Sequence, residues 1–161
     1  MFTIREIIDM AIQLEKNAET FYRTAVAKMS TPSLDPVLMC LANEERGHSK
    51  WFEKLKRLAE EPEAGRQGEE ISSAALRSLV GDQKFSLAEV DLAKIESIKE
   101  LIEVAIEHEK DTIIFYQMLQ SFIDDPETMK ELDHIIAEEE QHIKLLTKCE
   151  IEMANGKSSK P

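Results

Sequence analysis

Turn-forming residues and cysteine are scarce in this chain of 161 residues, which contains five Gly, five Pro and two Cys. A hydrophobic fraction of 42% with so little Gly and Pro excludes collagen-like, low-complexity and disordered chains. Cys40 and Cys149 form no C-x-x-C pair, which excludes a cysteine zinc site and a disulfide framework and favours a reducing compartment. The composition therefore predicts one globular domain built from long helices.

The chain also has few Lys and Arg residues and no long apolar run. The chain has 32 Asp and Glu against 20 Lys and Arg, a net charge of −12, so we expect no nucleic-acid partner and no membrane partner. The sequence contains no run of about 18 apolar residues, the length of a membrane-spanning helix. The N-terminal residues do not resemble a signal peptide, and we expect a cytoplasmic protein.

The chain contains an internal repeat at an offset of 94 residues. Residues 3–50 align with residues 97–144 without a gap, and 15 of the 48 columns are identical. Phe21, Tyr22 and His48 each recur in this constant register, which a shared helical composition would not produce. The repeat predicts a duplicated helical hairpin.

The ends of the helices are marked by capping and turn signals. Capping boxes at 3–6 and 97–100 begin each half, and Pro-containing turns at 30–32 and 124–126 divide it. We expect helices at about 4–29, 34–60, 98–122 and 127–154, a crossover at about 61–96 and a flexible tail at 155–161, so that 1–154 form one domain.

The crossover is long enough to span the whole bundle. A helix of about 26 residues is roughly 39 Å long, and the 36 residues of the crossover can return along it, so that the second and third helices run parallel. Pro62, Gly65 and Gly68 interrupt the crossover, and one or two short helices are expected in it. Two repeated hairpins joined in this way predict an all-α fold that resembles the ferritin-like four-helix bundle.

Each predicted helix carries an inward stripe of apolar residues, interrupted near its middle by a carboxylate. In the second and fourth helices a histidine follows three residues later. The residues concerned are Glu15, Glu45, His48, Glu109, Glu139 and His142.

Carboxylates on an apolar stripe cost several kcal/mol unless another charge compensates them. A single Glu of this kind fits an exposed position on a misassigned stripe, but four in the same relative position do not. No Lys or Arg lies on any of the stripes. Two divalent cations would balance the four carboxylates, and the two histidines would add neutral nitrogen ligands.

At this point the sequence resembles the rubrerythrins of the ferritin superfamily. The matching strings are Glu15-Lys-Asn-Ala-Glu-Thr-Phe-Tyr22, Glu44-Glu-Arg-Gly-His48, Glu109-Lys-Asp-Thr-Ile-Ile-Phe-Tyr116 and Glu138-Glu-Glu-Gln-His142. A Glu from each of two helices and Glu-x-x-His from the other two is the ligand pattern of ferritin-like di-iron and di-manganese proteins.

The resemblance implies a role for each of these residues. Glu45 and Glu139 would bridge two iron ions, with manganese or zinc as alternatives. Glu15 and Glu109 would be terminal ligands, His48 and His142 would each bind one metal, and no other catalytic residue is expected. Tyr22 and Tyr116 are expected either to hydrogen-bond the bridging carboxylates or to be core aromatics.

Three departures from the resemblance bear on function. The rubredoxin domain of full-length rubrerythrins is missing, Thr112 stands where those proteins carry an extra carboxylate, and Arg46 stands where bacterioferritin carries a haem-ligating Met. The resemblance implies an oxidoreductase that reduces hydrogen peroxide or dioxygen with an external, rubredoxin-like electron donor. Iron binding or storage of the bacterioferritin type, and a metal-bound bundle without turnover, remain the alternatives.

Residues beside the stripes are assigned to solvent. Glu44, Glu138, His108 and His134 are all expected on solvated helix faces. Apolar crossover residues are expected to cover a homodimer interface or to cap the bundle, namely Leu76, Leu79, Val80 and Phe85.

Overall fold

The computed structural model describes residues 3–58 and 90–157, and these residues form helices and no strand. The long helices are α1 (Ile4–Met29), α2 (Asp35–Leu58), α4 (Ile98–Gln120) and α5 (Pro126–Lys157), and a short 3-10 helix, η2 (Leu92–Lys94), precedes α4. The expected all-α four-helix bundle is confirmed. No helix among the described residues combines the length and the hydropathy needed to cross a bilayer.

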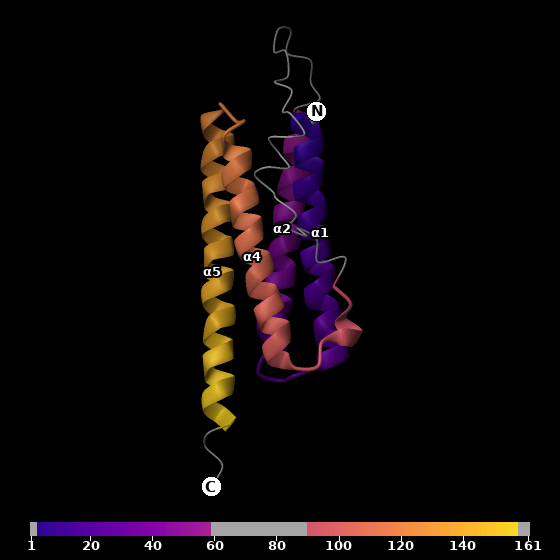
Figure 1. Ribbon diagram of the computed structural model, residues 1–161. Coiled ribbons are helices and arrows are strands. Elements are labelled where there is room, and N and C mark those ends of the chain that lie inside the picture. Colours follow the sequence, from indigo (N-terminus) through magenta and orange to yellow (C-terminus); the bar gives the residue numbers. More distant parts are fainter. Residues whose placement is uncertain (1–2, 59–89, 158–161) are drawn as a thin grey trace.

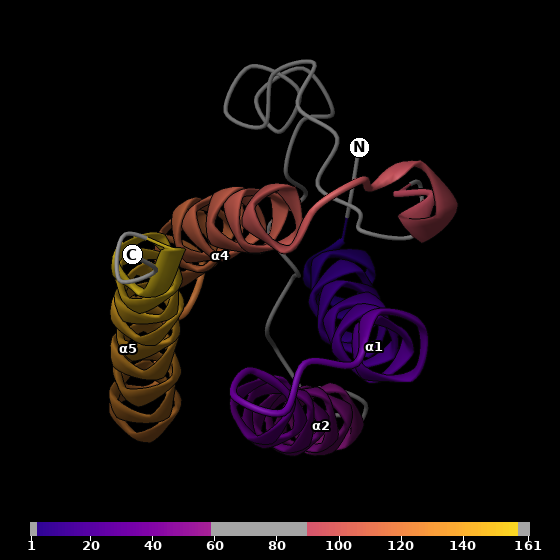
Figure 2. The same cartoon turned by 90° about the horizontal axis from the view of Figure 1, so that it is seen from below.

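The bundle consists of two antiparallel hairpins, α1 with α2 and α4 with α5 (Figure 1). Helices α2 and α4 run in the same direction. The view along the bundle in Figure 2 shows the hairpins side by side, and the contacts across them join α1 to α4 and α2 to α5. This is the crossover arrangement that the sequence predicts.

The first helix of each hairpin begins at a hydroxyl cap. At α1 the side chain of Thr3 accepts from the backbone N–H of Glu6, and the Glu6 carboxylate accepts from the N–H of Thr3, which completes a capping box. At α4 Ser97 accepts from the N–H of Glu100, but the Glu100 carboxylate accepts from Glu96 instead. The second capping box is therefore only half formed.

An aspartate lies at the start of the second helix of each hairpin, as the first residue of α2 and directly before α5. Asp35 accepts from the N–H of Thr31 at 2.8 Å, and Asp125 accepts from the N–H of Thr128 at 2.8 Å. Pro126 occupies the first position of α5, where its missing N–H costs nothing. These hydrogen bonds fix the turns that join the two helices of each hairpin.

Two helix ends differ from the sequence-based expectation. Helix α4 ends at Gln120 rather than 122, because the N–H groups of Ser121 and Phe122 bond to carbonyls three residues back and tighten the turn. Helix α5 continues through 155–157, which the sequence assigns to a flexible tail. Gly156 is exposed in the last turn of α5, where its lower helix propensity costs little.

Several expectations lie outside the described residues. These are the crossover from 61 to 89, including Leu76, Leu79, Val80 and Phe85, and the tail from 158 to 161. Within the described part of the crossover, η2 is held by Asp91, whose side chain accepts from the N–H of Ala93 at 3.0 Å.

The apolar core forms two layers with a polar layer between them. One layer joins the start of α1 and the end of α4 and includes Ile7, Ile8, Phe52, Leu119, Leu132 and Ile135. The other joins the end of α1 and the start of α4 and includes Ala18, Leu38, Leu41, Leu101, Ile102 and Leu146. Each fully buried Leu or Ile contributes roughly 1.5–3 kcal/mol of transfer free energy. The two layers therefore shield the middle of the bundle from water.

Candidate metal centre

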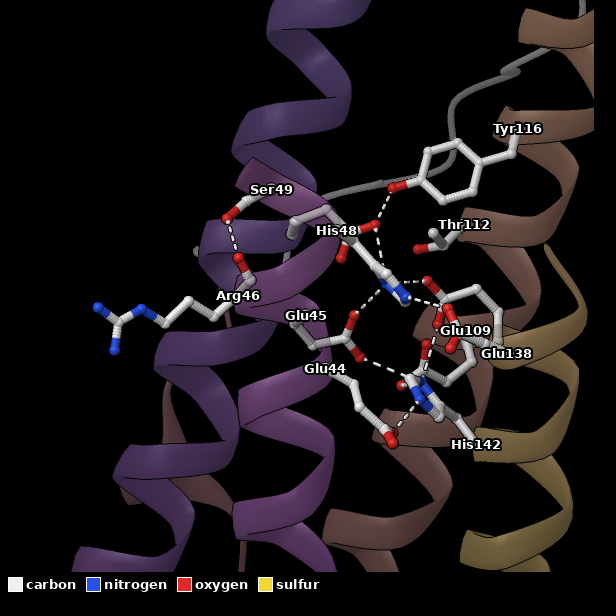
Figure 3. Close-up of polar contacts among 12 residues, drawn as sticks. Glu44, Glu45, Arg46, His48, Ser49, Glu109, Thr112, Tyr116, Glu138 and His142 are labelled. Atoms are coloured by element: carbon white, nitrogen blue, oxygen red, sulfur yellow. Dashed lines mark hydrogen bonds and ion pairs between the residues drawn. The ribbon is translucent and has the colours of Figure 1, made fainter. Parts of the chain in front are cut away.

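The polar layer at the middle of the bundle contains all six of the residues that the sequence singles out. They come from four helices and are no more than 5% exposed: Glu15 (α1), Glu45 and His48 (α2), Glu109 (α4), Glu139 and His142 (α5). Figure 3 shows side chains of this layer converging from both hairpins. The inward stripe places these residues on one level, because each lies near the middle of its helix.

The six side chains form two overlapping groups of four. Glu15 and His48 join Glu45 and Glu139 in one group, and Glu109 and His142 join the same two carboxylates in the other. Within each group, one oxygen or nitrogen atom per residue lies within 4.8 Å of the others. Glu45 and Glu139 are thus shared by both groups.

Both histidines turn Nδ1 toward the shared carboxylates. His48 Nδ1 lies 3.2 Å from Glu45 and 3.0 Å from Glu139. His142 Nδ1 lies 3.2 Å from Glu45 and 2.9 Å from Glu139. The two rings are nearly parallel with centroids 6.1 Å apart, and each belongs to one of the two groups.

The other ring nitrogen of each histidine contacts a carboxylate of the opposite hairpin. His48 Nε2 lies 2.9 Å from Glu138, and His142 Nε2 lies 2.8 Å from Glu44 (Figure 3). The assignment of these two carboxylates to solvent is therefore wrong in part, since each is 37–44% exposed but has one oxygen on a buried ring. Both equivalent positions of the repeat, 44 and 138, carry Glu, and this recurrence is the sequence signal that could have identified the two residues.

The second carboxylate oxygens of Glu44 and Glu138 lie near Cys40 and His134, which occupy equivalent positions of the repeat. Glu44 Oε1 lies 3.8 Å from the thiol of Cys40, and Glu138 Oε1 lies 3.4 Å from His134 Nε2. Cys40 is exposed, and His134 is 68% exposed, as the sequence predicts for His134. The approximate two-fold symmetry of the repeat thus extends from the centre to the surface.

The two tyrosines hydrogen-bond carboxylates, but not those assigned as bridges. Tyr22 donates to Glu109 and Tyr116 donates to Glu15, each from the neighbouring helix across the two hairpins. Helices α1 and α4 are in contact, so each hydroxyl meets the carboxylate of the facing helix first. Burial, and then the nearby carboxylates, raise the pKa of both tyrosines, which keeps each hydroxyl protonated as a donor.

Crowding raises the pKa of carboxylates in the centre. Burial is the largest cause for Glu45, followed by the charges of Glu139, Glu109 and Glu15. Burial and the charge of Glu139 likewise raise the pKa of Glu109. These carboxylates are therefore held in an environment that penalises their charged form.

Contacts between carboxylates and imidazoles lower the pKa of a carboxylate and raise the pKa of a histidine. Burial and the charge of Glu15 favour a higher pKa for Glu139, but contacts with His142 and His48 outweigh them, and its pKa is lowered. Burial alone would lower the pKa of both histidines. The carboxylates around them, led by Glu139 for His48 and Glu109 for His142, instead raise the pKa well above the ordinary value.

The donor set fits two divalent cations. Four buried polar atoms lack a well-directed hydrogen-bond partner: Glu45 Oε1, both carboxylate oxygens of Glu139, and His142 Nδ1. No Lys or Arg is among the buried side chains of the part of the chain that the structure describes. Carboxylate oxygen and imidazole nitrogen together suit iron, manganese and zinc. The polar layer is therefore a candidate site for a pair of metal ions.

Two further polar residues, His108 and Thr112, lie close to this layer. His108 is 7% exposed, so its assignment to solvent is wrong, and its Nε2 lies 3.4 Å from the hydroxyl of Thr112. His108 comes three residues after the buried Ala105, at the margin of the inward stripe, and this spacing is the signal for its burial.

One family model and three solved structures are similar to this chain. The family model described as Rubrerythrin matches residues 6–150. A comparison with curated proteins gives no match.

Three solved structures are similar over most of the chain. A putative ferritin-like diiron-carboxylate protein from Thermotoga maritima is 25% identical, with a TM-score of 0.67 over 94% of this chain and 97% of that one. A hypothetical protein from Pyrococcus furiosus is 22% identical, with a TM-score of 0.71 over 96% and 92%. A bacterioferritin with a diiron site from Desulfovibrio desulfuricans is 19% identical, with a TM-score of 0.65 over 94% and 80%.

Proposed function

The chain belongs to the rubrerythrin family, and from this premise we propose that it is a di-iron oxidoreductase that reduces hydrogen peroxide or dioxygen. The observation that supports the proposal is the pair of overlapping carboxylate and histidine groups, which share Glu45 and Glu139. Two bound irons would together supply the two electrons that reduce peroxide to water. Manganese or zinc would fit the same donors.

Each residue of the centre has a proposed part. Glu45 and Glu139 would bridge the metals, because each belongs to both groups. Glu15 and His48 would complete one metal position. The other position would be completed by Glu109 and His142. The tyrosine hydroxyls hold the two unshared carboxylates in place, and the apolar layers on either side keep water away from the reacting groups.

The electrons would come from another protein. The 161 residues contain no C-x-x-C pair for a rubredoxin-type iron site, so we propose an external, rubredoxin-like donor. Cys40 and Cys149 are free thiols, which suits the reducing cytoplasm proposed for this protein. We further propose that it works as a homodimer.

One observation favours iron storage as a second candidate function. The centre has six ligand residues and Thr112 in place of an extra carboxylate, which resembles the symmetrical centre of bacterioferritin. Ferroxidation in such a protein would only load iron. The two candidates differ in the oxidant that the reduced centre prefers.

The deciding experiment is a stopped-flow comparison of two oxidants. The protein is loaded anaerobically with two ferrous ions per chain and mixed with hydrogen peroxide or with dioxygen at equal concentration. The proposal expects faster oxidation by peroxide and repeated turnover with an external reductant. Faster oxidation by dioxygen, followed by further iron uptake, would support storage instead. The Glu53→Gln variant, changed at an exposed carboxylate outside the centre, is the matched control.

A further inference from the structure

The two halves of the centre are not equivalent at two buried positions of α4. The repeat pairs Thr112 with Ala18 and His108 with Leu14, so α1 carries apolar side chains where α4 carries a hydroxyl and an imidazole. All four residues are buried, at 1–7% exposure. Ala18 and Leu14 show that apolar side chains serve the packing of a helix at these positions. The polar pair on α4 therefore calls for a reason other than packing.

Thr112 is directed at the candidate metal centre. It lies one turn after Glu109 and one turn before Tyr116, and the carboxylate and hydroxyl of these neighbours both take part in the centre. Figure 3 shows the hydroxyl oxygen of Thr112 turned inward toward the cluster, on the side of Tyr116 and His48. At 2% exposure this hydroxyl has no access to bulk water.

The tautomer of His108 decides which way the hydroxyl proton of Thr112 can point. A hydroxyl has one proton to donate, and the partner that the described residues give Thr112 is His108 Nε2, at 3.4 Å. When Nε2–H donates to Thr112 Oγ1, the Thr112 proton is left to point into the centre. When Nε2 accepts instead, the hydroxyl has no donor left for any other group.

We propose that Thr112, oriented by an Nε2–H donor on His108, binds a small oxygen-containing substrate at one side of the metal pair. The inference rests on the proposed function and deepens it, since it gives peroxide or dioxygen a hydrogen-bond donor at the centre. It also makes the two metal positions different, because Ala18 offers no such donor on the α1 side. Thr112 is then a substrate-binding residue and His108 a positioning residue.

The test uses azide as a probe of small-ligand binding and needs no turnover. The protein is loaded with two ferric ions per chain and titrated with azide, and binding is followed by the charge-transfer absorption. Thr112→Val keeps the shape of the side chain and removes the hydroxyl. We expect azide affinity to fall about 3- to 10-fold, the effect of one lost hydrogen bond, with the iron content unchanged.

Matched variants separate binding from folding. Ser49→Ala removes another buried hydroxyl, one that donates to the Arg46 carbonyl and not to the centre, and should leave azide affinity unchanged. Thr112→Ser should retain the wild-type affinity. If Thr112→Val fails to fold, Thr112→Ala, with the residue that α1 carries at the equivalent position, takes its place.

The variants of His108 test the orienting hydrogen bond. His108→Leu, with the residue that α1 carries at the equivalent position, should weaken azide binding, and His108→Gln, which restores an N–H donor, should recover part of the affinity. Equal azide affinity in the wild type and Thr112→Val at full iron content would overturn the inference. So would a di-ferric wild type that binds no azide. A wild type that binds azide through Thr112 but fails to reduce peroxide would contradict only the proposed function.

Discussion

His48 of one hairpin is held by Glu138 of the other, with 2.9 Å between the ring Nε2 and the carboxylate. In the metal-loaded protein an N–H donated in this direction would leave Nδ1, which is aimed at the centre, as the nitrogen that binds the metal. The repeat builds the same relationship a second time between His142 and Glu44. Each half of the protein therefore orients the histidine of the other half.

Glu138→Ala should weaken metal binding without abolishing it. Loss of the carboxylate frees the His48 ring to rotate and to take the other tautomer, and such changes usually cost 10- to 100-fold in metal affinity. Competition with a chelator of known affinity measures the loss. Glu44→Ala should behave in the same way, and Glu140→Ala, at an exposed neighbour, is the control. Wild-type affinity in both variants would show that the contacts do not orient the rings.

Removal of a shared carboxylate should cost both metals, and removal of an unshared one should cost mainly one. Glu45 and Glu139 belong to both groups, whereas Glu15 and Glu109 each belong to one. We expect Glu45→Ala and Glu139→Ala to retain well under one metal per chain, and Glu15→Ala and Glu109→Ala to retain close to one. Elemental analysis of the four purified variants measures this directly. Equal losses in all four would refute the assignment of bridges.

Metal-free protein should lose stability as pH rises above about 4.5, the ordinary pKa of Glu. The pKa values of Glu45 and Glu109 are raised in the folded protein, so folding favours their protonated forms and that stabilisation is lost as pH rises through the raised values. The raised pKa values of His48 and His142 act in the same direction above 6.5. Glu139, with a lowered pKa, opposes this trend only as pH falls below its ordinary value.

Metal-loaded protein should show the opposite dependence, because protonation of the ligands competes with the metal. Thermal melting of the chelated and loaded forms between about pH 5 and pH 8 provides the test. In the chelated form Glu45→Gln should flatten the slope, since the neutral amide removes one of the buried charges. A chelated wild type that melts at one temperature across this range would remove the argument from crowded carboxylates.

The positions of the six central residues could be predicted because helical periodicity decides them. Glu15 recurs as Glu109 and Glu45 as Glu139 at the same offset of 94 residues, and a buried carboxylate at the middle of each apolar stripe needs a compensating cation. The partners of these residues could not be predicted in the same way. The carboxylate that accepts from the hydroxyl of Tyr22 is decided by the offset between neighbouring helices of the bundle. The residue spacing within one helix gives no information on that offset.

Residues at the margin of a stripe were the least predictable. Periodicity defines a face about 100° wide, and the burial of a residue at its edge depends on how closely the next helix approaches. His108 is covered in the structure, whereas Glu138 stays partly exposed with one oxygen on His48. The sequence assigns both to solvent, because a polar side chain beside the stripe is usually solvated.

Iron uptake should stop at about two ions per chain, the capacity of a single di-metal centre. A storage protein deposits mineral inside a closed shell of many subunits, whereas the proposed homodimer has no such interior. Aerobic ferrous titration, combined with the mass of the particle in solution, measures capacity and assembly together. Glu45→Ala should abolish most of the uptake, since it removes a carboxylate shared by both groups. Uptake of tens of irons per chain into a shell-sized particle would overturn the proposed oxidoreductase and establish storage.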